Sequence, residues 1–409
     1  MAESVLFENK NFKNIIDYVY ENGDRKFNEL NFNVLDNAVF SAFSYIPFEL
    51  FEKQNSAFKP KKLSELCLDF FAWINLNYLV EHFPDWLRRS IFLAMAMFRR
   101  KRYANCLVTD FSFEFSEKES TQFGALNILI EDGTASVVFR GTDNSILGWK
   151  EDFNLACYEA VRGQINARKF LKNMMNEFPD KRFRIMGHSK GGNLAVYSAC
   201  LLPKTKMDRI IRIYSNDGPG LNENVFNSEG HDLIQDKITH IIVGEDVVGR
   251  LLCHEKAEYV VKSAPEKDYV MQHDIYNWHV DDLSFVKLER ISPESKFITD
   301  CVNIWLKESM PDSKVRERLV QSIFEAEEKT GVDEVGTILK NPKKFILDFL
   351  RHTNGIDKQD RKLMTKAFMD LIMTMVKNYP SYLKDKSEYA NKQKTEVKKE
   401  TEMSLSEVK

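Results

Sequence analysis

A serine flanked by glycines is the group of residues best suited to chemistry in this chain. Gly187-His188-Ser189-Lys190-Gly191-Gly192 has the form G-x-S-x-G, with a third glycine behind it. The run before it, 183–186, is strand-like and the run after it, 193–200, is helix-like, which is the order that a nucleophile elbow requires. There the Ser189 hydroxyl would project above a sheet, at a helix N-terminus that stabilises negative charge. The alternative is a glycine-rich turn with an incidental serine.

Such a serine needs partners, because its hydroxyl becomes a good nucleophile only when a histidine accepts its proton and a carboxylate orients that histidine. In α/β hydrolases the acid and then the histidine follow the serine along the chain. Two downstream acids end apolar runs, Asp217 in IYSNDGPG and Asp246 in IIVGEDVVG, and position alone does not separate them. Three downstream histidines stand in suitable contexts: His254, His273 and His279. For His254 and His279 we favour the alternative of a structural or surface histidine.

The pattern of apolar and β-branched residues along the chain predicts the helices and strands that must position these residues. From about 126 to 280, short β-branched runs alternate with helix-like segments, which predicts a mostly parallel sheet covered on both faces. Before and after this stretch, apolar residues recur at helical spacing, and Ser292-Pro293-Glu294 provides a helix start. We expect a helical N-terminal lead-in packed on the core at 1–110, an α/β-hydrolase core at 111–290, a helical C-terminal extension at 291–380 and a disordered Lys- and Glu-rich tail at 381–409.

Composition narrows the class of protein. The 58 Lys and Arg residues nearly balance the 61 Asp and Glu residues, for a net charge of −3, so no electrostatic feature favours nucleic acid as a partner. The six cysteines are scattered singly without zinc spacing, which predicts a reduced compartment and no metal site. The N-terminus does not resemble a secretory signal, and the longest uncharged apolar run, 91–98, is far shorter than the roughly 20 residues of a membrane span. We expect a soluble, cytoplasmic protein without cofactors.

Three motifs stand in order along the chain: Val137-Val138-Phe139-Arg140-Gly141-Thr142, then Trp149 and Asp152, then the serine motif. This ordered set resembles the class 3, or fungal-type, lipases with their F-R-G-[ST], W-x-x-D and G-H-S-x-G-G signatures. The chain looks closer still to an uncharacterised bacterial branch of intracellular α/β hydrolases. That branch shares a segment like Phe32–Asn37 leading to Ser44-Tyr45 and an H-D-x-x-x-W like His273 to Trp278. The resemblance spans about Asn31 to Val280 and implies an α/β-hydrolase fold with a mostly parallel central sheet.

Carried over position by position, the resemblance implies Ser189 as the nucleophile, Asp246 as the acid and His273 as the general base. Asp217 becomes a second-choice acid, and His279 and His254 are second-choice bases. The resemblance also implies that the backbone N–H groups of two further residues, Thr142 and Lys190, form the oxyanion hole, to which the Thr142 hydroxyl can add.

One departure concerns Lys190, which stands where secreted lipases usually carry Leu. The backbone N–H survives this change, but an aliphatic acyl pocket beside the serine is placed in doubt. The charge points either to an anionic substrate or to a solvated lysine in the first turn of a helix.

The leading hypothesis is a serine esterase or lipase-like hydrolase that cleaves a carboxylic ester through an acyl-enzyme, with a small ester, a lipid or a lysophospholipid as substrate. A thioesterase or acyltransferase would use the same residues. The alternative from another class is a catalytically silent hydrolase scaffold whose C-terminal helices bind a protein partner.

Peripheral membrane contact is a further hypothesis. It depends on aromatic residues around Phe70, Phe71, Trp73 and Trp86 and on the basic cluster Arg99-Arg100-Lys101-Arg102. The alternative, which we favour, is a buried helix face followed by a solvated charge run.

Overall fold

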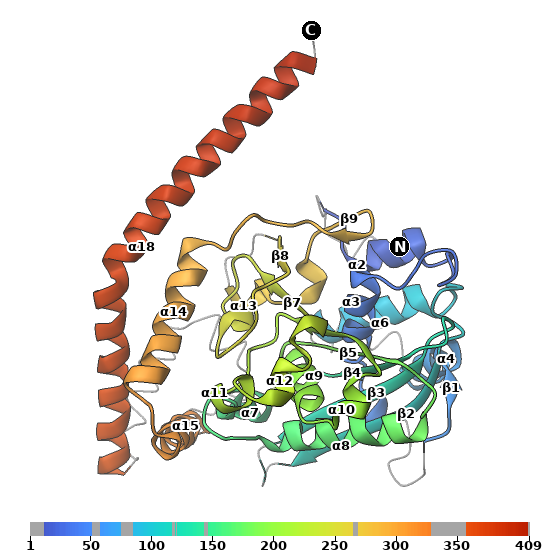
Figure 1. The fold of residues 1–409 in the computed structure, drawn as a ribbon, viewed down its shortest axis with the longest axis horizontal. Helices are drawn as coiled ribbons and strands as arrows, with labels where there is room; N and C mark the ends of the chain where they lie inside the picture. The colour runs from blue at the N-terminus through green and yellow to red at the C-terminus, as the bar shows by residue number, and fades with distance from the viewer. Residues whose placement is uncertain are drawn as a thin grey trace.

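An eight-stranded sheet lies at the centre of the part of the chain that the structure describes (Figure 1). The structure is a computed structural model that describes residues 12–50, 58–74, 85–116, 119, 121–142, 146–264, 269–328 and 357–407. The strands are β1 (Lys61–Lys62), β2 (Leu107–Ser116), β3 (Thr121–Leu129), β4 (Ala135–Phe139), β5 (Phe183–His188), β6 (Ile210–Asn216), β7 (Ile238–Val243) and β8 (Tyr259–Val261). They lie in the sheet in chain order.

Strand direction divides this sheet into two parts. The pairs from β1 to β4 are antiparallel, whereas β4, β5, β6, β7 and β8 are all parallel to one another. Strand β5 therefore lies inside the parallel part, paired on both sides. The sheet begins before residue 126, where the sequence pattern places its start: β1 and β2 come earlier in the chain, and β2 also alternates apolar and polar residues.

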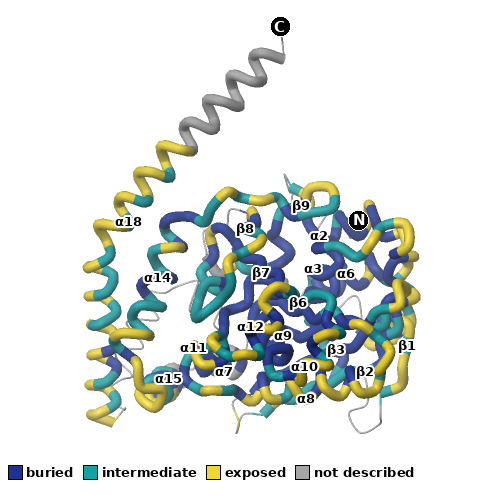
Figure 2. The backbone as a smooth tube through the Cα atoms, viewed as in Figure 1, coloured by how far each residue is buried: buried dark blue, intermediate teal, exposed yellow. Residues whose placement is uncertain are grey.

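Helices cover both faces of the sheet, and consecutive side chains of a strand pack into two different hydrophobic cores, one on each face. Val138 and Met186 pack with the N-terminal helices, while Val137 and Ile185 pack with the helices that follow β4 and β5. The first core contains α2 (Ile15–Asn22), α3 (Val34–Phe43), α4 (Leu63–Trp73) and α6 (Asp85–Met97), and the second contains α8 (Arg162–Glu177) and α9 (Lys190–Cys200). Figure 2 shows α9 and β7 as buried throughout.

The other described elements before residue 290 are short. They are α7 (Ile146–Asn154), α10 (Lys204–Met207), α11 (Glu223–Phe226), α12 (Glu229–Asp232) and α13 (Tyr269–Gln272), the 3-10 turns η1 (Phe48–Leu50), η2 (Gln235–Lys237), η3 (Val248–Arg250) and η4 (Ile275–Asn277), and the hairpin of β9 (Val280–Asp281) and β10 (Ser284–Phe285).

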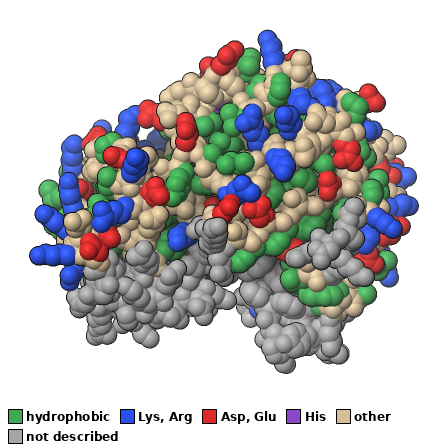
Figure 3. Space-filling model, turned by 90° about the horizontal axis from the view of Figure 1, so that it is seen from below, with side chains coloured by type: hydrophobic (Ala, Val, Ile, Leu, Met, Phe, Trp, Pro, Cys, Tyr) green, Lys and Arg blue, Asp and Glu red, His purple; other side chains and the backbone are tan. Residues whose placement is uncertain are grey.

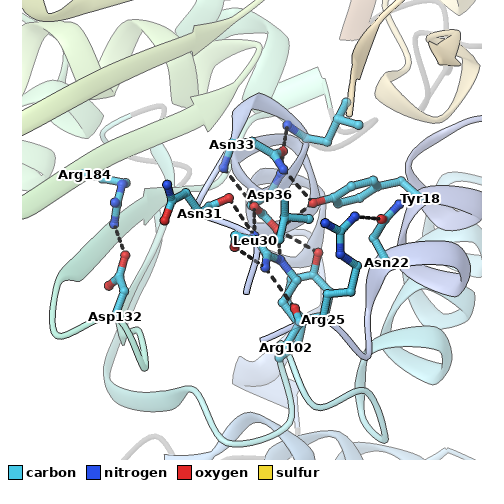
Figure 4. Close-up of polar contacts among 12 residues, drawn as sticks. Tyr18, Asn22, Arg25, Leu30, Asn31, Asn33, Asp36, Arg102, Asp132 and Arg184 are labelled. Carbon is cyan, nitrogen blue, oxygen red and sulfur yellow. Dashed lines mark hydrogen bonds and ion pairs between the residues drawn. The ribbon is translucent and has the colours of Figure 1, made fainter. Parts of the chain in front are cut away.

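A buried ion pair fixes helix α3 to the segment after α6 (Figure 4). The Arg102 guanidinium donates to both carboxylate oxygens of Asp36, at 2.7 and 2.6 Å, and neither side chain is exposed. The expectation of a solvated basic run is therefore wrong for Arg102, because a buried guanidinium requires a charged partner. Of the aromatic residues beside that run, Phe70 is buried and Trp73 is about half exposed, and the side chain of Trp86 lies outside the described residues.

The described residues of the C-terminal part form α14 (Pro293–Glu308), α15 (Ser313–Glu328) and α18 (Lys358–Glu407). Figure 1 shows α18 lying along α14 and then extending beyond the rest of the chain. The expected disordered tail at 381–409 is wrong as far as residue 407, because these residues continue α18. Lys and Glu are good helix formers, and two ion pairs, Lys296–Asp385 at 2.7 Å and Lys386–Glu294 at 2.8 Å, join α18 to α14.

The surface carries both signs of charge, as the nearly equal numbers of basic and acidic residues in the sequence lead us to expect. Figure 3 shows basic and acidic side chains interspersed with apolar ones on the face seen from below. Among the described residues, no helix is both long enough and apolar enough to cross a membrane.

Candidate active site

Ser189 occupies the turn between β5 and α9, the arrangement that the serine motif predicts. Its backbone angles are φ 59° and ψ −132°, in a region that a residue with a side chain rarely adopts. A Cβ on Gly187 would lie 2.3 Å from the Gly191 backbone, and one on Gly191 would lie 2.2 Å from the Phe139 carbonyl oxygen. Glycine is therefore required at both positions, and the expected strained elbow is confirmed.

His273 lies between α13 and η4, with its ring nitrogen Nδ1 facing two carboxylates. Nδ1 is 2.7 Å from Asp217 Oδ2 and 3.3 Å from Asp246 Oδ2. Asp217 directly follows β6 and Asp246 follows β7, so the ends of two adjacent parallel strands meet at this histidine. The structure thus brings together both acids that position along the chain could not separate.

The segment carrying His273 contacts the elbow. His188, the residue before Ser189, places its Nε2 at 2.8 Å from the His273 carbonyl oxygen, and the two imidazole rings are 4.6 Å apart. The Ser189 N–H donates to the Asn216 carbonyl at 2.9 Å, one residue before Asp217. The Nε2 atom of His273 is buried and has no hydrogen-bond partner among the described residues. This is the atom that a triad presents to its serine.

The pKa values of the two carboxyl groups are shifted in opposite directions. Burial lowers the pKa of His273, but the charge of Asp246 and hydrogen bonds with Asp217 and Asp246 outweigh it and raise that pKa to about 10. Burial, and then the Asp246 charge, raises the pKa of Asp217. Burial acts in the same direction on Asp246, yet the positive charge of His273 and its hydrogen bond hold the pKa of Asp246 low. The shorter distance to Nδ1 therefore favours Asp217 as the hydrogen-bond partner of His273, whereas the lowered pKa favours Asp246 as the ionised carboxylate.

Thr142 lies just beyond β4, beside the elbow. A Cβ on the preceding Gly141 would lie 2.5 Å from the His188 carbonyl oxygen, which shows how closely the two backbones approach. The Thr142 hydroxyl donates to Asp152 Oδ2 at 2.6 Å, so its proton is engaged by that carboxylate. Burial raises the pKa of Asp152 to about 6, although the Lys190 charge and the Thr142 hydrogen bond act against this. The backbone N–H is thus the donor that Thr142 can offer to a substrate oxygen.

Lys190 differs from both sequence-based expectations for its side chain. It is neither solvated nor directed at a ligand, because it is 0% exposed and its ammonium lies 2.8 Å from Glu151 Oε2. The reason is that α9 starts in the protein interior and all of its residues are buried. Sequence reasoning missed Glu151, although its place next to Asp152 in a helical segment was a usable signal.

The two second-choice histidines lie in other surroundings. The His279 ring stacks on Phe12 with centroids 4.1 Å apart, and burial lowers its pKa to about 4. His254 shares a hydrogen bond with the Glu255 carbonyl, and its ring lies 5.0 Å from that of His240. Both have structural contacts that suit the alternative we favour for them.

The acid cluster could be considered as a cation site, since one ligand atom each from Asp217, Asp246 and His273 lie within 4.8 Å of one another. However, Nδ1 stands at hydrogen-bond distance from one carboxylate at 2.7 Å, so a cation bound there would have to displace the Nδ1 proton. The donor set fits a hydrogen-bonded acid–histidine cluster better than a metal centre.

The sheet, its covering helices and the strained serine turn define an α/β hydrolase, as the sequence predicts. Residues 97–325, more than half of the chain, match the Mbeg1-like family, and the protein belongs to that family. The family match agrees with the lipase-like resemblance of the motifs.

Several solved structures of lipases are similar to the chain. M37 lipase is 18% identical, with 52% of this chain and 68% of that one covered and a TM-score of 0.33. Lipase II from Rhizopus niveus is 14% identical, with coverages of 62% and 85% and a TM-score of 0.33. Lip2 lipase from Yarrowia lipolytica is 14% identical, with coverages of 44% and 72% and a TM-score of 0.27. No curated protein matches the chain.

Proposed function

We propose that this protein is a serine hydrolase that cleaves a carboxylic ester through an acyl-enzyme. The observation that carries the proposal is the strained backbone of Ser189, at φ 59°, in contact with the segment of a histidine that two carboxylates hold. Strain of this kind costs about 1–3 kcal/mol and persists where the surrounding structure enforces it, most often at functional sites.

In the proposed reaction, Ser189 Oγ attacks the ester carbonyl carbon while His273 Nε2 takes the hydroxyl proton. The backbone N–H groups of Lys190 and Thr142 stabilise the oxyanion of the tetrahedral intermediate. As that intermediate collapses, the C–O bond breaks and the alcohol leaves with the proton from His273. Water, deprotonated by the same histidine, then hydrolyses the acyl-enzyme.

We assign different duties to the two acids at Nδ1. Asp246, which favours the ionised form, supplies the negative charge that stabilises the imidazolium. Asp217 lies closer to Nδ1, and its second oxygen accepts a hydrogen bond from the Val243 N–H at 3.1 Å, so it fixes the ring orientation. This assignment retains Asp246 as the acid and gives Asp217 an orienting function.

For the substrate we propose a class of ester and no single compound. A lipid or lysophospholipid ester is the substrate class that the lipase-like motifs imply, whereas the Lys190 charge gives no support for an anionic substrate, because Glu151 neutralises it. We also propose a cytoplasmic location, since the six cysteines are free thiols and five of them are buried. Membrane-surface contact stays a prediction, which liposome flotation of the whole chain tests.

Labelling with a fluorophosphonate probe tests the proposal. The wild-type chain should be labelled, and Ser189→Ala, with an unchanged circular dichroism spectrum, should not. Ester substrates of graded chain length, lysophospholipids and acyl thioesters then separate an esterase from a thioesterase. A folded wild-type chain that neither reacts with the probe nor turns over any of these substrates would indicate a silent scaffold.

A further inference from the structure

The buried ion pair of Lys190 and Glu151 lies beside the proposed site but takes no part in the reaction described above. Lys190 is 0% and Glu151 1% exposed, with the ammonium 2.8 Å from Oε2. Burying such a pair removes two charges from water, and well-packed apolar residues of similar volume are often equally stabilising. Stability alone therefore gives a weak reason for the pair.

Both members of the pair are fixed by further hydrogen bonds. Lys190 Nζ also donates to the Gln122 carbonyl at 2.8 Å, and Glu151 Oε2 accepts from the Gln122 N–H at 3.1 Å. Glu151 Oε1 accepts from the Gly163 N–H at 2.9 Å. A Cβ on Gly163 would lie 2.8 Å from that oxygen, so the carboxylate fits closely against glycine. The pair thus connects α7, the start of α9, β3 and the start of α8.

The neighbouring residue on α7 holds the other half of the proposed oxyanion hole. Asp152 accepts the Thr142 hydroxyl at 2.6 Å, while Glu151 binds Lys190. Adjacent carboxylates of one helix therefore hold the two residues whose backbone N–H groups we assign as oxyanion donors.

We propose that Glu151 and the Lys190 side chain are positioning residues that set the spacing of the two oxyanion donors through helix α7. This inference rests on the proposed hydrolase function. Neither side chain touches substrate, and both act through the backbone to which they are attached. Because donors must stand about 3 Å from the developing oxyanion, a small displacement of either N–H weakens transition-state binding more than substrate binding.

The test replaces both charges together, since changing one alone would leave a buried charge without its partner. Glu151→Gln keeps the side-chain length and an acceptor for Gly163, and Lys190→Met, with an unbranched side chain one atom shorter, keeps the backbone N–H of residue 190. The matched control is Arg102→Met with Asp36→Asn, which removes a second fully buried ion pair of the described residues, the one that joins α3 to the segment after α6. Each variant is assayed for kcat and KM with p-nitrophenyl butyrate, for inhibition by an alkyl boronic acid, and for its pH–rate midpoint.

We expect kcat of the first double variant to fall about 10- to 100-fold, less than the roughly 100- to 1,000-fold that complete loss of one oxyanion donor costs. KM should stay within about threefold, boronic acid affinity should fall with kcat/KM, and the pH midpoint should not move, because His273 is untouched. The control should lose thermal stability and keep kcat.

A folded double variant with wild-type kcat would overturn the positioning function and leave the hydrolase proposal intact. An inactive, probe-resistant wild type would overturn both. If the double variant does not fold, Glu151→Gln alone serves, and it must show the same loss of kcat at unchanged KM; wild-type kcat there overturns the inference.

Discussion

Replacing one carboxylate at His273 separates the charge of the acid pair from its geometry. The change is Asp246→Asn, compared with Asp217→Asn. In the proposed mechanism His273 must be neutral to accept the Ser189 proton, and its pKa is raised to about 10. The rate of acylation should therefore increase with pH, with a midpoint well above the ordinary histidine value of about 6.5.

The size of the expected shift in the pH–rate midpoint follows from the contacts of the two carboxylates with His273. A hydrogen bond to a charged group is worth about 1.5–3 kcal/mol, and one pKa unit corresponds to about 1.4 kcal/mol. Removing the Asp246 charge should therefore move the midpoint of the pH–rate profile down by about one to two pH units. Asp217, whose own pKa is raised toward the protonated form, carries less charge, so Asp217→Asn should move the midpoint less. That variant should instead lower the maximal rate, because it removes the 2.7 Å contact that orients the ring.

The assay is the rate of fluorophosphonate labelling of Ser189 from about pH 6 to 10.5, with Asp300→Asn as a surface control. A wild-type midpoint near 6.5 would refute the raised pKa, and equal shifts in both variants would refute the division between the acids. The raised pKa of His273 also makes the stability of the fold depend on pH. Protonated His273 contributes fully to stability below about pH 6.5, and this contribution is lost as the pH rises through about 10.

Three further predictions concern the remaining site residues. Ser189→Ala and His273→Ala should each lower ester hydrolysis by at least about 1,000-fold, and the double variant should be little worse in the same assay, because the two groups act as a unit. Thr142→Ala should cost well below the roughly 100-fold that loss of an oxyanion donor costs, since its backbone N–H survives; comparing kcat/KM with wild type checks this. Lys190→Leu should lower the free energy of unfolding in urea by about 3–5 kcal/mol, because it leaves Glu151 buried without its partner charge, and a loss under about 1 kcal/mol would contradict the buried pair.

The sequence predicted the elbow because its geometry is local. Strand, glycine-flanked serine and helix are consecutive, and the glycines are dictated by backbone contacts within this small region, such as the 2.3 Å approach at Gly187. The burial of Lys190 could not be predicted in the same way. Its partner lies 39 residues earlier in the chain, and only the packing of α7 against the elbow region brings the two charges together.

The C-terminal tail shows a different limit. Between 381 and 407 the residues are polar enough to suggest disorder, but polarity measures the lack of a core and says little about local helix preference. Lys, Glu and Ala favour helix even when exposed, and pairs such as Lys296–Asp385 need the neighbouring α14 to be in place. Composition alone could not supply that neighbour.

The pair of acids follows from the order of the strands. Because β6 and β7 are adjacent and parallel, their carboxyl ends reach the same edge of the sheet, and the residues just beyond them must lie close together. The Asp217 N–H donates to the Ile241 carbonyl at 2.7 Å, which places its carboxylate beside the end of β7. Two aspartates at successive strand ends therefore do not compete for one place; the topology brings both to the same histidine. Their different ionisation then arises from the site itself, since two buried carboxyl groups beside one imidazolium are not both stabilised as carboxylates.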